Sequence, residues 1–124
     1  MLSLNKIVAF VPTKDPAKAR SFYEGVLGFR FVKDDGFAMV LDANGIMIRV
    51  AKAPDFKPAP FTILGWQVSE IEKVVAMLHE KGVVFEIFSF LEQDKLGIWT
   101  APSGDKVAWF KDPDGNVLSV SQHV

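Results

Sequence analysis

The stretch Phe37-Ala38-Met39-Val40-Leu41-Asp42-Ala43-Asn44-Gly45 decides the fold, because the chain repeats it. Val107-Ala108-Trp109-Phe110-Lys111-Asp112-Pro113-Asp114-Gly115 aligns with it at a constant offset of 70 residues, and Ala, Asp and Gly coincide. In both copies an apolar run ends in a turn sequence, as strands joined by turns do. The 124-residue chain is therefore predicted to hold one structural module twice.

A predicted helix precedes each copy. The first covers residues 15–28, where Asp15 is a suitable N-cap, Pro16 suits the first helical position and Gly28 suits the left-handed position after the helix. The second opens with Ser69-Glu70-Ile71-Glu72, which reads as a capping box, and stops at Gly82.

The rest of the chain reads as strands separated by turn sequences. The expected strands are 6–11, 29–33, 37–41, 46–51, 62–68, 83–88, 97–101, 107–111 and 117–122. The predicted fold class is α+β, with two tandem βαβββ modules whose curved mixed sheets lie around a cleft. Module 1 is expected at about 5–52 and module 2 at about 61–123 of a single domain, with the Pro-rich residues 54–60 as the joint.

Composition excludes several classes of function. The chain has no Cys, which removes disulfides, thiolate catalysis and Cys-rich zinc sites. The net charge is -1, and Lys and Arg are scattered, so no nucleic-acid partner is expected. No apolar stretch reaches the roughly 20 residues of a membrane helix, and the N-terminus lacks the pattern of a signal peptide, so we expect a cytoplasmic protein without a membrane partner.

Strand alternation divides the side chains into two faces. One set is apolar and is expected to form the core under the helices: Ile7, Ala9, Val11, Ile46, Ile48, Val50, Leu64, Trp66, Val68, Leu118 and Val120. The opposite set is mixed but partly apolar, which suits the lining of a cleft: Lys6, Val8, Phe10, Met47, Arg49, Ala51, Ile63, Gly65, Gln67, Val117, Ser119 and Ser121.

Short motifs in the expected order resemble one known superfamily. Val8-Ala9-Phe10-Val11 followed by Asp15, Phe22-Tyr23 and Leu27-Gly28-Phe29 is similar to the opening of a vicinal oxygen chelate domain, and Asp112-Pro113-Asp114-Gly115-Asn116 resembles its closing hairpin. This superfamily includes glyoxalases, bleomycin-resistance proteins and extradiol dioxygenases. The resemblance covers nearly the whole chain and implies two βαβββ modules around a cleft, and a homodimer.

Enzymes of that superfamily typically bind a divalent metal through His or Glu near the start of each module's first strand and through Glu or another ligand on each module's last strand. The resemblance places these positions at Val8, Arg49, Ile63 and Ser119. Val and Ile cannot bind a metal, Arg would repel it and Ser is a poor ligand for the usual metals. We therefore expect neither a metal nor another cofactor.

Other catalytic groups are also weak candidates. His79 and His123 are expected at the surface, and mid-strand Glu86 is expected on a solvent face rather than acting as a base. No Ser occupies a nucleophile elbow, and no His is expected beside one. No catalytic residue is therefore assigned.

The expected ligand site is an apolar cleft with a few polar groups. Trp109 should share a face with Ser119 if Asp112–Asn116 is the hairpin loop, and Met39 is its counterpart in module 1. Arg49 on this face could hold a carboxylate or phosphate, or could instead reach solvent or pair with a nearby Asp or Glu. The aromatic residues could also be ordinary core. The assigned ligand-binding residues are Val8, Phe10, Met39, Arg49, Ile63, Gln67, Trp99, Trp109 and Ser119.

Three functions stay open. The favoured one is a metal-free protein that binds a small apolar or aromatic ligand, which can carry an anionic group. The second is a metal-dependent lyase, isomerase or dioxygenase with a different ligand arrangement. The third is a non-catalytic interaction or accessory module whose cleft is filled by its own side chains.

Overall fold

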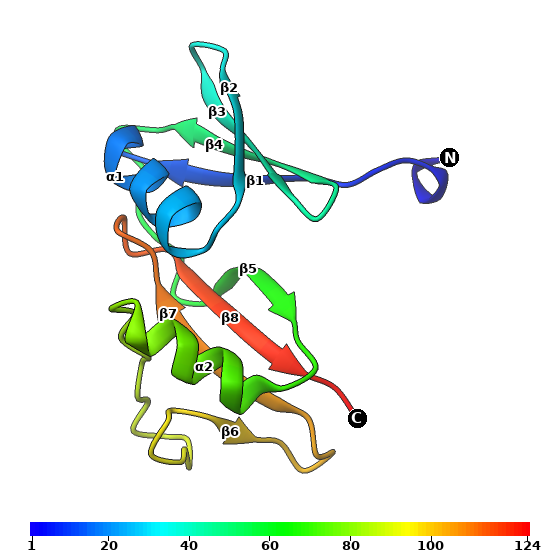
Figure 1. The fold of residues 1–124 in the computed structure, drawn as a ribbon, viewed down its shortest axis with the longest axis vertical. Helices are drawn as coiled ribbons and strands as arrows, with labels where there is room; N and C mark the ends of the chain where they lie inside the picture. Colours follow the sequence, from blue (N-terminus) through cyan, green and yellow to red (C-terminus); the bar gives the residue numbers. More distant parts are fainter. The chain divides into compact units, whose positions relative to one another are not determined.

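The computed structural model describes residues 1–124 and shows two compact units, residues 1–57 and residues 58–124. Each unit has one four-stranded mixed sheet and a helical segment after its first strand (Figure 1). The predicted α+β class with two βαβββ modules is therefore confirmed. No helix in the chain combines the length and the apolar character needed to cross a membrane.

The first unit places its strands in the order β1-β4-β3-β2. Strand β1 runs parallel to β4, whereas β4–β3 and β3–β2 are antiparallel. The elements are a short 3-10 helix at Leu2–Leu4, β1 at Val8–Thr13, α1 at Pro16–Arg20, a π-helix at Ser21–Val26, β2 at Arg30–Asp34, β3 at Ala38–Ala43 and β4 at Ile46–Lys52.

The helical segment of this unit begins and ends as its sequence predicts, but it changes type midway. The Lys18 backbone N–H donates to Asp15 Oδ1 at 3.2 Å, Pro16 is the first helical residue, and Gly28 has a φ of 79°. From Ser21 onward the segment is a π-helix rather than an α-helix. Tyr23 in this part is fully buried, and its ring centre lies 5.2 Å from that of Phe22 in an edge-to-face arrangement, so the π-helical turn packs against the core.

The second unit repeats this arrangement as β5-β8-β7-β6. Strand β5 is parallel to β8, and the other pairs are antiparallel. The elements are β5 at Thr62–Gln67, α2 at Ile71–Glu80, β6 at Trp99–Thr100, β7 at Lys106–Lys111 and β8 at Val117–Gln122.

Two local predictions for this unit are wrong. The Ser69–Glu72 capping box does not form: Gln122 Oε1 on β8 accepts from the Ile71 N–H at 2.9 Å, and Glu72 pairs with Lys106 at 2.7 Å. A tertiary contact has thus replaced the local cap. Residues 83–88 do not form a strand, because Phe85 makes only an isolated bridge with Phe110 along the edge of β7.

The predicted core face is confirmed at the centre of both sheets, but the prediction is wrong for two residues near strand ends. Ile7 is 73% exposed because it precedes the first paired residue of β1, and Ile46 is 46% exposed because it directly follows the hairpin turn. The residues confirmed as buried are Val11, Ile48, Val50, Leu118 and Val120.

The two hairpins differ in register by one residue, which moves Met39 to the other face. In the first unit Ala43 pairs with Ile46 across the two-residue turn Asn44-Gly45, whose φ angles are 51° and 85°. In the second unit Lys111 pairs with Val117, so the loop is longer. Arg49 consequently lies opposite Val40, and Met39 lies opposite Val50 on the core face, where it is 3% exposed. The assignment of Met39 as the counterpart of Trp109 is therefore wrong.

Candidate functional site

The strongest candidate site lies on one face of the second sheet. Trp109 on β7 pairs with Ser119 on β8, as predicted, and Ser119 pairs in turn with Gly65 on β5. These three residues form a row across the sheet. Trp99 on β6 pairs with Val107, which lies two residues from Trp109 and therefore on the same face. We call the surface formed by Gly65, Phe88, Trp99, Trp109 and Ser119 the aromatic face.

Three rings of the aromatic face are in contact. Trp109 lies between the other two, with its ring centre 5.5 Å from Phe88 in an edge-to-face arrangement and 6.1 Å from Trp99. All three side chains are only partly buried. Such pairs are favourable by about 0.5–1.5 kcal/mol each beyond the burial of area, so the cluster holds its shape while it leaves aromatic surface accessible.

Gly65 contributes no side chain to this row. We call the part of the row formed by Gly65 and Ser119 the floor of the aromatic face. A Cβ atom at Gly65 would lie 3.1 Å from Ser119 Oγ and 3.3 Å from the Ser119 carbonyl oxygen, so no side chain fits without a shift. Glycine inside a strand often marks a place where a ligand or another backbone approaches closely. Ser119 is 8% exposed, and its hydroxyl is the polar group in this floor.

Of the other two residues assigned to this unit, Gln67 lies on this face and Ile63 does not. The β5–β8 register shifts between Thr62 and Leu64, so Ile63 is the extra residue of a bulge. Thr62, not Ile63, pairs with Val117 and shares the face of Ser119. Gln67 pairs with Ser121 on the same face and is exposed.

In the first unit, the corresponding face carries Arg49 between two hydrophobic neighbours. Phe10 on β1 and Val40 on β3 pair with Arg49 from either side, and Val8 pairs with Met47 further along. Phe10 is 64% exposed and Val8 is 39% exposed, whereas Val40 is buried. Val8 and Phe10 therefore present apolar surface, as predicted for this face.

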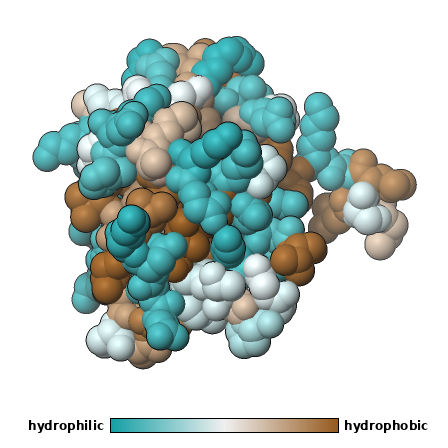
Figure 2. Space-filling model, turned by 60° about the horizontal axis from the view of Figure 1, so that its bottom comes forward, coloured by the Kyte–Doolittle hydropathy of each residue, from teal (hydrophilic) through white to brown (hydrophobic).

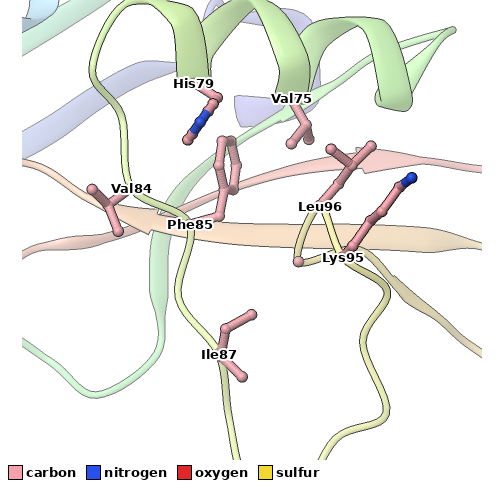
Figure 3. Close-up of a pocket in the computed structure, with 8 residues that line it drawn as sticks. Val75, His79, Val84, Phe85, Ile87, Lys95 and Leu96 are labelled. Atoms are coloured by element: carbon pink, nitrogen blue, oxygen red, sulfur yellow. The ribbon is translucent and has the colours of Figure 1, made fainter.

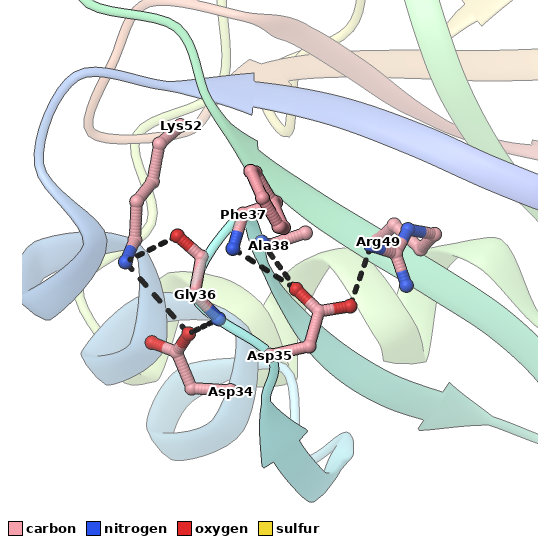
Figure 4. A network of polar contacts seen from close by, with 7 residues as sticks. All are labelled: Asp34, Asp35, Gly36, Phe37, Ala38, Arg49 and Lys52. Carbon is pink, nitrogen blue, oxygen red and sulfur yellow. Dashed lines mark hydrogen bonds and ion pairs between the residues drawn. The ribbon is translucent and has the colours of Figure 1, made fainter.

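Arg49 is not a free cation. Its Nη2 lies 2.7 Å from Asp35 Oδ2, and the two side chains are 25% and 28% exposed (Figure 4). The other oxygen of Asp35 accepts the backbone N–H groups of Phe37 and Ala38 at 3.0 and 2.9 Å. The Arg49 hydrogen bond, followed by those of Ala38 and Phe37, holds the pKa of Asp35 well below its usual range. An anionic ligand would have to compete with this carboxylate.

Neither unit contains a group of three or more His, Asp or Glu side chains arranged to hold a metal ion. Both histidines are exposed, as expected. Glu86 lies 3.5 Å from Lys111 Nζ, so its carboxylate has a cationic partner. The residues at the four expected ligand positions, Val8, Arg49, Ile63 and Ser119, thus have no acidic or imidazole cluster beside them.

The expectation that no His lies beside a Ser is wrong. His123 Nε2 is 2.9 Å from Ser121 Oγ, and His123 Nδ1 is 3.3 Å from Asp105 Oδ2. Hydrolysis by such a chain also requires donors for an oxyanion and a projecting nucleophile, whereas Ser121 lies inside a regular strand. Asp105 also accepts the Val124 N–H at 2.9 Å, which with His123 lowers the pKa of Asp105. The contacts therefore clamp residues 123–124 to the 102–105 turn.

Sequence reasoning missed three residues of these two faces. Gly65 was placed on the right face, but the meaning of a glycine inside a strand was not used. Phe88 was assigned to a strand, and only its position beside β7 reveals its contact with Trp109. Asp35 lies between the expected strands 29–33 and 37–41, and no signal in the sequence fixes its pairing with Arg49, which is 14 residues away.

A sequence model described as the Glyoxalase/Bleomycin resistance protein/Dioxygenase superfamily matches residues 3–120. No curated protein matches the chain. Similar solved structures include the bleomycin resistance determinant encoded on the transposon Tn5, with a TM-score of 0.75 and 21% identity over 96% of this chain and 98% of that one.

Two further solved structures resemble this fold. An antibiotic-binding protein from Streptomyces sp. CB03234 has a TM-score of 0.73 and 23% identity, covering 97% of this chain and 96% of its own. A lactoylglutathione lyase from Agrobacterium tumefaciens has a TM-score of 0.72 and 16% identity, covering 95% and 92%. At these identities the likeness concerns the fold, which both a binding protein and an enzyme share.

Proposed function

Because the chain belongs to the glyoxalase/bleomycin resistance protein/dioxygenase superfamily, we propose that it is a metal-free protein that binds a small aromatic or apolar molecule at the aromatic face. The observation that carries this proposal is that Trp109 contacts both Phe88 and Trp99 beside the floor formed by Gly65 and Ser119. A planar ligand can stack on the tryptophans while its edge lies over Gly65. Exposed Gln67 lies on the same face, two residues along β5 from Gly65.

The physical basis is that stacking is strong without being specific for one molecule. The Trp rings offer large, rigid surface at little conformational cost, and the Ser119 hydroxyl adds one hydrogen bond that can fix orientation. Two relatives of this fold are a bleomycin resistance determinant and an antibiotic-binding protein. These relatives support sequestration of an aromatic natural product as the class of function.

The first experiment measures binding of two fluorescent probes that differ in charge. Anilinonaphthalene sulfonate carries one anionic group, and N-phenylnaphthylamine has a similar aromatic body without it. We expect both to bind, and Trp109→Leu to weaken both by about tenfold, equivalent to about 1.4 kcal/mol. Trp66→Phe is the matched control, because Trp66 stacks on Phe110 on the core face. Equal binding to the Trp109→Leu and original proteins would refute the proposal.

The same titrations test whether Arg49 forms a separate anion site in the first unit. If an anionic ligand uses Arg49, Arg49→Ala weakens the sulfonate probe only, and Asp35→Ala strengthens it by removing the competing carboxylate. Equal effects of Arg49→Ala on both probes would show that Arg49 does not recognise the anionic group. Bleomycin is the third ligand to titrate, because two similar structures are described by antibiotic resistance or binding.

Metal content and oligomeric state complete the proposal. Near-zero metal per chain, after exposure to zinc, nickel, manganese and ferrous iron and then desalting, is expected; close to one metal per chain would bring the enzyme function to first place. We propose a homodimer, as the resemblance to the superfamily implies; large apolar side chains such as Leu2, Ile7 and Phe37 are exposed, and Figure 2 shows apolar side chains at the surface. Light scattering after gel filtration measures this.

A further inference from the structure

A pocket lies in the second unit, between α2 and the segment that follows it. Its volume is about 250 Å³, and its walls come from Val75 and His79 of α2 and from residues 84–97. Phe85 on this segment contacts Phe110 on the core face, whereas the neighbouring Phe88 contacts Trp109 on the aromatic face. The pocket is therefore distinct from the aromatic face. The side chains used below are Val75, His79, Phe85, Ile87, Lys95 and Leu96 (Figure 3).

The lining is apolar except for two basic side chains. Val75, Phe85, Ile87 and Leu96 provide hydrocarbon surface, and no Asp or Glu lines the pocket. Lys95 makes no ion pair in the structure, unlike Lys106 and Lys111 of the same unit. Figure 3 shows the Lys95 side chain extending from the loop toward α2 beside Leu96, with the His79 ring descending from α2 on the other side of Phe85. An unpaired cation beside an apolar wall favours an anion with an apolar body.

The loop that carries Lys95 is fixed by hydrogen bonds, so the pocket exists without a ligand. Gln93 Nε2 donates to the carbonyl groups of Glu86 and Gly97 at 2.9 and 2.8 Å, and Gln93 Oε1 accepts the Phe88 N–H at 2.8 Å. Asp94 Oδ1 accepts the N–H groups of Leu96 and Ile98, both at 2.9 Å. A preformed site loses less conformational entropy on binding.

Gly97 adds a steric constraint in the same loop. Its φ is 89°, and a Cβ atom there would lie 3.2 Å from Phe85 Cβ and 3.7 Å from Ile87 Cδ1. The loop therefore packs against these two walls of the pocket without a side chain between them. This close packing holds Lys95, two residues away, at the rim.

We propose that this pocket binds a small monocarboxylate with an apolar body, with the carboxylate at Lys95 and the hydrocarbon against Val75, Phe85 and Ile87. The volume is below the roughly 300–1,000 Å³ of clefts that hold drug-sized ligands, so the ligand is short. This location is separate from that of the aromatic face. The proposal for this pocket can therefore be tested separately from the proposed function.

The test compares ligands that share one hydrocarbon chain. Hexanoate, hexanol and hexylamine are titrated into the isotope-labelled 124-residue chain, and binding is followed by the amide chemical shifts of Phe85, Leu96 and Gly97. We expect hexanoate to shift these amides in a saturable way, hexanol to bind about tenfold more weakly and hexylamine to leave them unchanged. Equal binding of hexanoate and hexanol would overturn the role of Lys95, and no saturable shift with hexanoate would overturn the site.

Two variants and one control complete this test. Lys95→Met keeps the apolar stem and removes the charge, so hexanoate should bind about tenfold more weakly while hexanol is unaffected. Lys81→Met is the matched control, because Lys81 follows α2 in the same unit but does not line the pocket. Trp109→Leu should leave hexanoate binding unchanged. A loss of hexanoate binding in Trp109→Leu would assign these shifts to the aromatic face and refute a second site.

Discussion

Substitution of Gly65 by alanine tests whether the floor of the aromatic face has room for a side chain. Relieving the backbone entropy of a strand glycine stabilises a protein by about 0.5–1 kcal/mol where the added methyl group fits. At Gly65 the methyl group would lie 3.1 Å from Ser119 Oγ and 3.3 Å from the Ser119 carbonyl oxygen. Overpacking of this kind costs about 1–3 kcal/mol, so we expect a net destabilisation of about 1 kcal/mol.

Urea unfolding of three variants measures this value against its controls. Gly25→Ala is the matched control, because a Cβ atom there meets nothing within 4 Å, and it should leave stability equal or higher. Ser119→Ala removes the hydroxyl but keeps the carbonyl oxygen, so Gly65→Ala should cost less in a Ser119→Ala background. A double-mutant cycle isolates that coupling from the separate effects of the two substitutions.

The same variant should also bind aromatic probes less well. The methyl group occupies the floor beside Trp109, so we expect N-phenylnaphthylamine to bind about fivefold more weakly under conditions where Gly65→Ala is folded, a loss of about 1 kcal/mol. If Gly65→Ala unfolds at higher urea than the original protein and binds the probe equally well, then the strands are not as close as described. The reasoning that places a ligand over Gly65 would then be refuted.

Three further predictions concern the framework around the two faces. Asp35 has a lowered pKa in the folded protein, so the stabilisation it gains from Arg49 is fully present above the unfolded pKa of about 3.9 and is lost as the pH falls through the folded pKa. The loss of unfolding free energy on acidification should therefore be smaller in Asp35→Asn than in the original protein. Gln122→Ala leaves the Ile71 N–H without its acceptor and should lower the free energy of unfolding by about 1 kcal/mol in urea, with faster amide exchange in the first turn of α2; unchanged exchange would contradict the cap. Gly45→Val forces a branched side chain to a φ of 85° and should lower the unfolding free energy by about 1–2 kcal/mol, a loss that thermal denaturation would detect.

The fold was largely predictable because its signals are local and repeated. Asp15, Gly28 and the repeated turn sequences each act within a few residues of where they lie, so the order of strands and helices follows from the chain itself. The cap of α2 was not predictable, because Gln122 reaches Ile71 from 51 residues away and displaces the local box. Residues 83–88 carry a strand-like pattern, yet they pair with β7 at a single bridge.

The candidate site was predictable only as far as the register of each hairpin was known. Trp109 and Ser119 were correctly placed because the long loop between Lys111 and Val117 fixes their pairing. The same reasoning failed for Met39, because a repeat seen in sequence does not require loops of equal length. The two-residue turn in the first unit shifts the pairing by one residue, and a shift of one residue exchanges the faces.

The matched positions Arg49 and Ser119 differ in what surrounds them. In the first unit, Arg49 is held by Asp35, and its neighbour Val40 is buried, so the position is occupied by internal contacts. In the second unit, Ser119 lies between Gly65, which has no side chain, and Trp109, whose ring is only partly buried. A ligand binds more tightly to surface that is already rigid in the free protein and that the protein's own contacts do not occupy. Phe88, Trp99 and Trp109 meet that condition and the Arg49–Asp35 pair does not, so truncation of the tryptophans, rather than of the arginine, should decide whether the protein binds aromatic molecules.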